Sequence, residues 1–152
     1  MSESPKHKLH IYPQGDLEVV MTRDFDAPRQ LVWDAWTKPE LVKRWLYGPE
    51  GWSMTRCDID LRVGGAYRFE MTLTDGSETM GWGGIYKELD EPERFVNTEQ
   101  FDESWYEGES LQTNVLTQKD GVTHFESTMR YVSTAARDAV LLAVAVNTVM
   151  KG

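Results

Sequence analysis

Cysteine is nearly absent from this sequence, because Cys57 is the only one in 152 residues. A single cysteine excludes an intramolecular disulfide and gives no support for export to an oxidising compartment. Long hydrophobic runs are missing as well, since no segment approaches the roughly 18 apolar residues of a membrane span. The N-terminal residues MSESPKHKLH are polar and lack the apolar run of a signal peptide. We therefore expect a cytoplasmic protein that does not bind a membrane.

Basic residues are few relative to acidic ones. The chain has 16 Lys and Arg against 25 Asp and Glu, which gives a formal net charge of -9. This balance disfavours nucleic acid as a partner. Metal-ligating spacings are also lacking, because His7 and His10 lie in a polar N-terminal stretch, and neither His124 nor Cys57 has a nearby ligand in sequence. We expect no metal and no cofactor, and we assign no catalytic residue.

Aromatic residues are plentiful, with six Trp, six Tyr and five Phe. Because they are spread over segments that should meet in one interior, they indicate a core or cavity walled by rings. For any single ring, ordinary core packing is the favoured interpretation. Taken together, the rings suit a pocket for a small apolar molecule, with methionines as adaptable parts of its wall.

The order of predicted elements indicates an α+β fold. Residues 1–16 look like a flexible leader, and residues 17–152 form a single domain. A strand is predicted from Leu17, then two short helices that begin after Asp26-Ala27-Pro28 and Thr37-Lys38-Pro39. Strands follow near 52–61, 66–74, 79–89, 94–101, 110–118 and 122–131, joined by short turns such as Asp75-Gly76 and Asp120-Gly121. The chain closes with a helix that Ser133 or Thr134 can cap.

The stretch DLRVGGAYRFEM (60–71) allows two interpretations. A glycine loop that binds phosphate sits between a strand and a helix N-terminus. Here the glycines are followed by alternating Tyr67, Phe69 and Met71, which predicts a strand. The favoured interpretation is a hairpin turn, with Asp60 and Arg62 paired beside it. The glycines of GWGG (81–84) similarly predict a bent or bulged strand.

Several phrases resemble the START-like, helix-grip superfamily, also called SRPBCC or Bet v-like. Within it, the sequence is most similar to the family named after the activator of heat-shock protein 90 ATPase. The matching phrases are RDFDAPRQLVWDAWTKPELVKRWLYGPEG (23–51), DLRVGGAYRFEM (60–71), GGIYKELDEPERFVNTEQF (83–101) and MRYVSTAARDAV (129–140). The resemblance implies a curved antiparallel sheet wrapped around a C-terminal helix. It also implies a cavity that related families use for lipids, polyketides or flavonoid-like molecules.

This resemblance and the alternation of the strands together define a set of cavity candidates. Glu99 is included because it shares its side of the strand with Phe95 and Phe101, whereas Arg68 and Glu70 should face solvent. The candidates are Trp36, Trp45, Tyr47, Met54, Tyr67, Phe69, Met71, Trp82, Tyr86, Glu99, Phe101, Trp105, Met129 and Tyr131.

Three functions stay open at this stage. The leading hypothesis is a non-catalytic domain that binds a small apolar or amphipathic ligand. The family name suggests a role in the stress response with a chaperone partner, and a polyketide cyclase or aromatase-like activity would use Glu99 or a tyrosine as acid–base group. The final helix, LLAVAVNTVMKG, is apolar nearly all round, which predicts a homodimer formed through that helix.

Overall fold

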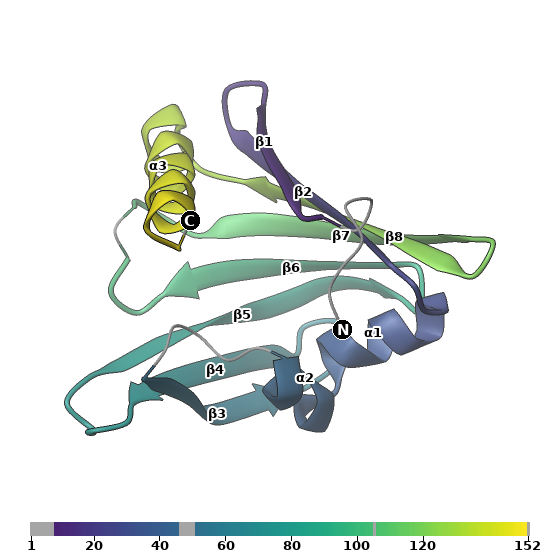
Figure 1. Ribbon diagram of the computed structural model, residues 1–152, viewed down its shortest axis with the longest axis horizontal. Coiled ribbons are helices and arrows are strands. Elements are labelled where there is room, and N and C mark those ends of the chain that lie inside the picture. Colours follow the sequence, from purple (N-terminus) through teal and green to yellow (C-terminus); the bar gives the residue numbers. More distant parts are fainter. Residues whose placement is uncertain (1–7, 46–50, 105, 152) are drawn as a thin grey trace.

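The computed structural model describes residues 8–45, 51–104 and 106–151, and gives only the backbone for residues 45 and 145–151. One antiparallel sheet has the strand order β1-β2-β8-β7-β6-β5-β4-β3. Figure 1 shows this curved sheet with α1 and α2 at one end and α3 at the other. The strands are β1 (His10–Gln14), β2 (Glu18–Phe25), β3 (Trp52–Ile59), β4 (Ala66–Leu73), β5 (Thr79–Asp90), β6 (Arg94–Phe101), β7 (Ser110–Lys119) and β8 (Val122–Arg130); the helices are α1 (Arg29–Thr37), α2 (Pro39–Trp45) and α3 (Thr134–Lys151).

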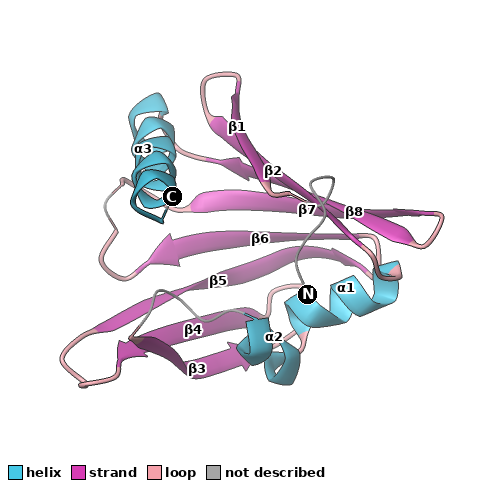
Figure 2. Ribbon diagram, viewed as in Figure 1, coloured by secondary structure: helices cyan, strands magenta, loops and turns pink. Residues whose placement is uncertain are grey.

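Strand β1 lies within the segment predicted as a leader. It pairs with β2 through an antiparallel ladder that runs from His10↔Thr22 to Gln14↔Glu18. Ile11 packs on the apolar cluster around Val19, and this contact stabilises the short strand. Pro13 is compatible with the position because β1 is an edge strand and one side of it needs no hydrogen-bond partner. The two predicted helices therefore follow a second strand rather than the first (Figure 2).

Helix α1 packs its Val32 and Trp33 side chains into the core. Trp33 is 1% exposed, whereas Leu31 is 56% exposed. Leu31 lies at the margin of the buried face, where it lines an apolar groove together with Val32, Ala35 and Trp36. The helix lies against β7 and β8, and Trp33 meets the ring of Phe95 on β6 edge-on at 5.4 Å.

The glycine stretch 60–71 forms a hairpin, as predicted. Gly64 has φ +85, a conformation that glycine adopts at little cost. Arg62 Nε donates to Asp60 Oδ2 at 2.8 Å beside the turn. An exposed pair of this kind contributes only about 0–1 kcal/mol. Both glycines bind the backbone of Tyr86 on β5, because the Gly65 carbonyl accepts from Tyr86 N at 2.9 Å and Gly64 N donates to the Tyr86 carbonyl at 2.8 Å.

The glycines of β5 let the sheet curve, which was the prediction from GWGG. A β-carbon on Gly84 would lie 1.9 Å from the carbonyl oxygen of Thr98 on the neighbouring strand. The β5–β6 register also shifts between Tyr86 and Glu88. Close backbone approach and a local irregularity both bend a sheet toward one face. This bend produces the concave face on which the aromatic side chains gather.

Helix α3 is capped and anchored at its N-terminal end. Ser133 Oγ accepts from Ala136 N at 3.1 Å, so Ser133 is the cap. Arg137, which is 8% exposed, donates through Nη1 to the carbonyl oxygen of Gly15 at 2.8 Å. Leu142 on the same helix is 66% exposed, and dimerisation through this helix stays a prediction. Among the described residues, no helix has both the length and the apolarity to cross a membrane.

Candidate functional site

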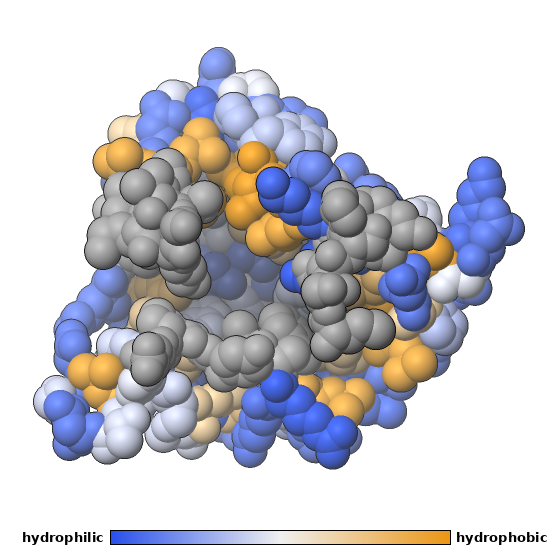
Figure 3. All heavy atoms as spheres, in the orientation of Figure 1, coloured by the Kyte–Doolittle hydropathy of each residue, from blue (hydrophilic) through white to orange (hydrophobic). Residues whose placement is uncertain are grey.

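A cavity of about 200 Å³ opens on the concave face, between α1 and strands β4 to β7. The face seen in Figure 3 is hollowed at its centre. Six of the residues that the sequence singles out line this cavity: Trp36, Tyr67, Phe69, Trp82, Tyr86 and Glu99. Four more complete the lining, namely Phe95, Asn97, Gln112 and Asn114. These four are not among the cavity residues predicted from the sequence. Asn97 could have been predicted, because it lies on the same side of its strand as Phe95 and Glu99.

Aromatic rings from neighbouring strands form one continuous wall of the cavity. The Tyr67 ring lies 5.3 Å from Phe69 and 5.5 Å from Tyr86, measured between ring centroids. Phe69 meets Trp82 at 5.6 Å with an interplanar angle of 69°. Offset and edge-to-face pairs at these distances stabilise one another beyond simple area burial. The wall is therefore rigid and presents apolar surface to whatever enters.

Opposite these rings, three side-chain amides form a directed chain of hydrogen bonds across β6 and β7. Asn114 Nδ2 donates to Asn97 Oδ1 at 3.0 Å, and Asn97 Nδ2 donates to Gln112 Oε1 at 3.3 Å. Gln112 in turn donates to the carboxyl group of Glu99. Each amide donates to the next member of the chain toward Glu99, so these hydrogen bonds favour negative charge there. We call Asn114, Asn97, Gln112 and Glu99 the amide relay.

Tyr67 fixes the relay to the backbone. Its hydroxyl donates to the carbonyl oxygen of Thr98 at 2.6 Å and accepts from Asn97 Nδ2 at 3.0 Å. Burial raises the pKa of the Tyr67 phenol, and the nearby Glu99 raises it further. The ring is therefore neutral at ordinary pH. Its role in the cavity is to hold the Asn97 amide in one orientation.

Glu99 supplies the carboxyl group that lines the cavity. Its side chain is partly accessible because it lines the cavity, yet surrounding protein desolvates the carboxyl. This desolvation raises the pKa of Glu99, and the hydrogen bond from Gln112 opposes the shift. A carboxyl in this position can donate a hydrogen bond when protonated and accept several when ionised.

The raised pKa predicts how stability depends on pH. A carboxyl whose pKa is higher in the folded chain destabilises the fold progressively as pH rises from about 4.3 through the folded pKa. Glu99→Gln is therefore expected to raise the free energy of unfolding at pH 8 by about 1.4 kcal/mol for each unit of pKa difference, and to change it little at pH 4. Urea unfolding at the two pH values measures this. Glu126→Gln, on the outward side of β8, is the control and should change the free energy of unfolding by no more than about 0.5 kcal/mol. The prediction is contradicted if Glu99→Gln lowers the free energy of unfolding equally at both pH values.

The other predicted cavity residues lie elsewhere in the interior or outside the described part. Met71 is 2% exposed and belongs to the core, with Met54 packed against it. The Phe101 ring lies 5.6 Å from that of Trp82, with an interplanar angle of 31°. Met129 and Tyr131 lie in a second cluster with Tyr106, next to α3. Three predictions fall outside the described residues or side chains: Trp45, Tyr47 and Trp105.

A larger apolar groove of about 580 Å³ lies on the other side of Trp36. Trp36 lines both hollows and stacks on Phe125 at 4.6 Å with an interplanar angle of 6°. The groove is lined mainly by apolar side chains, with Arg23 as its charged member: Leu9, Met21, Arg23, Phe25, Ala27, Leu31, Val32, Ala35, Trp36 and Phe125. The stacked rings of Trp36 and Phe125 therefore separate the cavity, which has polar side chains on β6 and β7, from the apolar groove.

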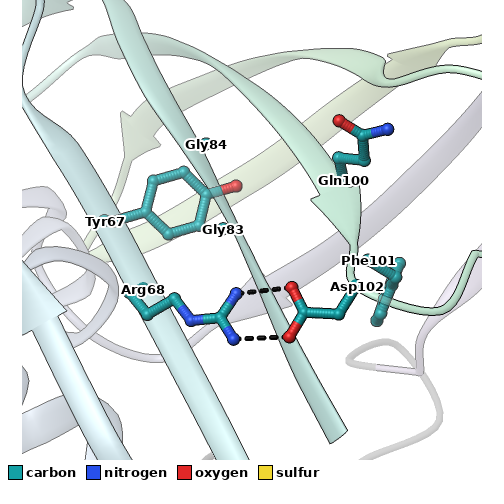
Figure 4. A pocket seen from close by; sticks show the side chains of 7 residues that line it. All are labelled: Tyr67, Arg68, Gly83, Gly84, Gln100, Phe101 and Asp102. Carbon is teal, nitrogen blue, oxygen red and sulfur yellow. Dashed lines mark hydrogen bonds and ion pairs between the residues drawn. The ribbon is translucent and has the colours of Figure 1, made fainter.

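A third hollow involves the pair Arg68 and Asp102, which Figure 4 shows joined by two parallel contacts. Arg68 Nη1 donates to Asp102 Oδ1 at 2.7 Å, and the guanidinium lowers the pKa of Asp102. Gly81 permits this pair, since a β-carbon there would lie 2.3 Å from Arg68 Nη2. Because the two charges already satisfy each other, this hollow offers little to a charged ligand. The prediction that Arg68 faces away from the cavity agrees with this pairing.

Metal binding and cysteine chemistry gain no support from the described residues. No group of three or more His, Cys, Asp or Glu is placed to hold a metal in that part of the chain. Cys57 is buried, and burial raises the pKa of its thiol, which makes it less reactive. His124 Nδ1 lies 2.6 Å from Asp24 Oδ1 on the surface.

Known structures with the same fold match most of this chain. A protein of Rhodobacter sphaeroides is 32% identical, with a TM-score of 0.81 over 88% of this chain and 84% of its own. A protein of Mycobacterium smegmatis is 26% identical, with a TM-score of 0.77 over 92% and 89% of the two chains. An Hsp90 activator of Plasmodium falciparum is 20% identical, with a TM-score of 0.57 over 76% and 74%, and shares the fold. No curated protein matches this chain.

The family model described as Activator of Hsp90 ATPase homolog 1-like protein matches residues 26–150. This range includes both short helices, strands β3 to β8 and nearly all of α3. The match agrees with the START-like, helix-grip architecture seen in the sheet and helices. The chain therefore belongs to the family of Activator of Hsp90 ATPase homolog 1-like proteins.

Proposed function

We propose that this domain binds a small apolar or amphipathic molecule in the cavity between α1 and strands β4 to β7. The observation that carries the proposal is the pairing of an aromatic wall with the amide relay in one hollow. Binding sites for small molecules are mostly apolar, with a few placed polar groups that fix orientation. The cavity has that composition, because six aromatic rings face three amides and one carboxyl.

The size of the cavity limits the ligand. At about 200 Å³ it is smaller than the roughly 300–1,000 Å³ of typical ligand pockets. A single aromatic or aliphatic ring with a polar substituent fits such a volume. A longer ligand would need Trp36 to swing away from Phe125, which would join the cavity to the apolar groove. We therefore place the polar part of the ligand at the amide relay and its apolar part against the rings.

Titration of the isotope-labelled chain with 2-phenylethanol, followed by NMR, tests the proposal. We expect shifts at residues of the cavity and a higher melting temperature. Phe69→Trp should reduce affinity about fivefold or more by filling the cavity, since overfilling a packed site costs about 1–3 kcal/mol. Ile85→Trp places the same ring on an exposed position of β5 and is expected to leave affinity unchanged. Shifts confined to residues outside the cavity would refute the proposal, and so would the absence of any shift or stabilisation with both this alcohol and the amine of the same size, 2-phenylethylamine.

A chaperone-linked role is the second candidate, supported by the family match over residues 26–150. If the domain acts on an Hsp90-type chaperone, adding it to the purified chaperone should raise the ATPase rate. An unchanged rate over a wide concentration range would exclude this role. The two candidates are separable, because only the first requires the cavity to be accessible.

A further inference from the structure

The carboxyl group of Glu99 occupies the cavity without a cationic partner among the described residues. Its side-chain hydrogen bond is the one from Gln112, and no described arginine, lysine or histidine forms an ion pair with it. Gln112 ends a chain in which Asn114 donates to Asn97 and Asn97 donates to Gln112, and its hydrogen bond to the carboxyl opposes the effect of desolvation. A buried carboxylate without a counter-ion is costly, and a cation that enters with a ligand would offset that cost.

Within the described part of the chain, the ionisable groups whose pKa values Glu99 influences are phenols, and they cannot neutralise it. Tyr67, Tyr106 and Tyr131 all lie close enough for Glu99 to influence their pKa values. Burial raises the pKa of Tyr106 to about 12 and raises those of Tyr67 and Tyr131 as well. All three phenols are therefore uncharged at pH 7. A positive charge next to Glu99 has to come from outside the described chain.

The walls of the cavity also favour a cation. The faces of Trp, Tyr and Phe rings carry negative electrostatic potential and attract ammonium groups within about 6 Å. Trp36, Trp82, Phe69 and Phe95 line the same cavity as Glu99. At long range, the net charge of -9 raises the local concentration of cations near the protein and lowers that of anions.

From these observations we infer that the cavity selects a small organic cation, an amine carried on an apolar ring or short chain. The ammonium binds the Glu99 carboxylate, and the apolar body lies against the aromatic wall. Gln112 holds the carboxylate in place. This inference rests on the proposed binding function and adds the chemical class of the ligand to it.

Three probes of nearly equal size and different charge test the inference: 2-phenylethylamine, 2-phenylethanol and phenylacetate. Each is titrated into the labelled full chain at pH 7.5, and the dissociation constant is taken from NMR shifts of cavity residues. We expect the amine to bind about tenfold to a hundredfold more tightly than the alcohol, the range for a hydrogen bond to a charged group. Phenylacetate should bind most weakly. Affinity for the amine should also rise with pH through the range in which Glu99 ionises.

Glu99→Gln is the decisive variant, since it keeps the shape of the side chain and removes its charge. It should bring the amine down to about the affinity that the same variant shows for the alcohol. Glu126→Gln, on the outward side of β8, makes the same change in net charge and should keep the preference for the amine. Equal binding of alcohol and amine to the wild type would overturn the inference and leave the binding function standing. If none of the three probes shifts cavity residues, both are overturned.

Discussion

Replacing Trp33 with alanine is expected to lower the free energy of unfolding by about 3–5 kcal/mol. Trp33 is 1% exposed and meets the Phe95 ring edge-on at 5.4 Å, so truncation leaves a cavity between α1 and the sheet. Most domains have only about 5–15 kcal/mol of stability in total. The variant should therefore unfold at a much lower temperature than the wild type, and urea unfolding measures the loss.

Leu31→Ala is the matched control for this prediction, because Leu31 lies on the same helix and is 56% exposed. Leu31→Ala should lower the free energy of unfolding by no more than about 0.5–1 kcal/mol. Since α1 also carries Trp36 into the cavity, Trp33→Ala should in addition weaken binding of 2-phenylethanol in the fraction that stays folded. A Trp33→Ala variant as stable as Leu31→Ala would show that α1 does not depend on this ring.

The second large effect is expected at Arg137, which anchors α3. Its Nη1 donates to the carbonyl oxygens of Gly15 at 2.8 Å and Glu18 at 3.3 Å, and the side chain is buried. Arg137→Met keeps much of the apolar stem but leaves these carbonyls without their donor. Hydrogen bonds to charged groups contribute about 1.5–3 kcal/mol each, so we expect a loss of about 2–3 kcal/mol in urea unfolding.

Hydrogen exchange separates this local effect from a global one. In Arg137→Met, amides of α3 and of the β1–β2 hairpin should exchange faster, while those of β4 and β5 should change less. Arg130→Met is the control, since Arg130 is exposed and its contact with Glu18 is long, at 3.8 Å. If Arg130→Met costs as much as Arg137→Met, the anchoring role of Arg137 is wrong.

The cavity residues were only partly predictable from sequence. Tyr67 and Phe69 could be placed on the concave face because they alternate along one strand. Glu99 could be placed there as well, from its shared parity with Phe95 and Phe101. The partners of Glu99 could not, because Asn97 faces Gln112 only through the register of β6 with β7. Register between strands depends on packing and turn geometry far from the residues it aligns.

The sequence by itself determined the order of β2 to β8 and the three helices, and it determined the turns. Turns are set by local chemistry, as in Asp120-Gly121, where both residues have positive φ. Only the tertiary structure decided which tryptophan of α1 is buried, that residues 10–14 pair with β2, and that Arg137 reaches Gly15. The position of the amide relay beside the aromatic wall was likewise decided only by the tertiary structure. Contacts between residues distant along the chain depend on register and helix rotation, and neither leaves a local pattern.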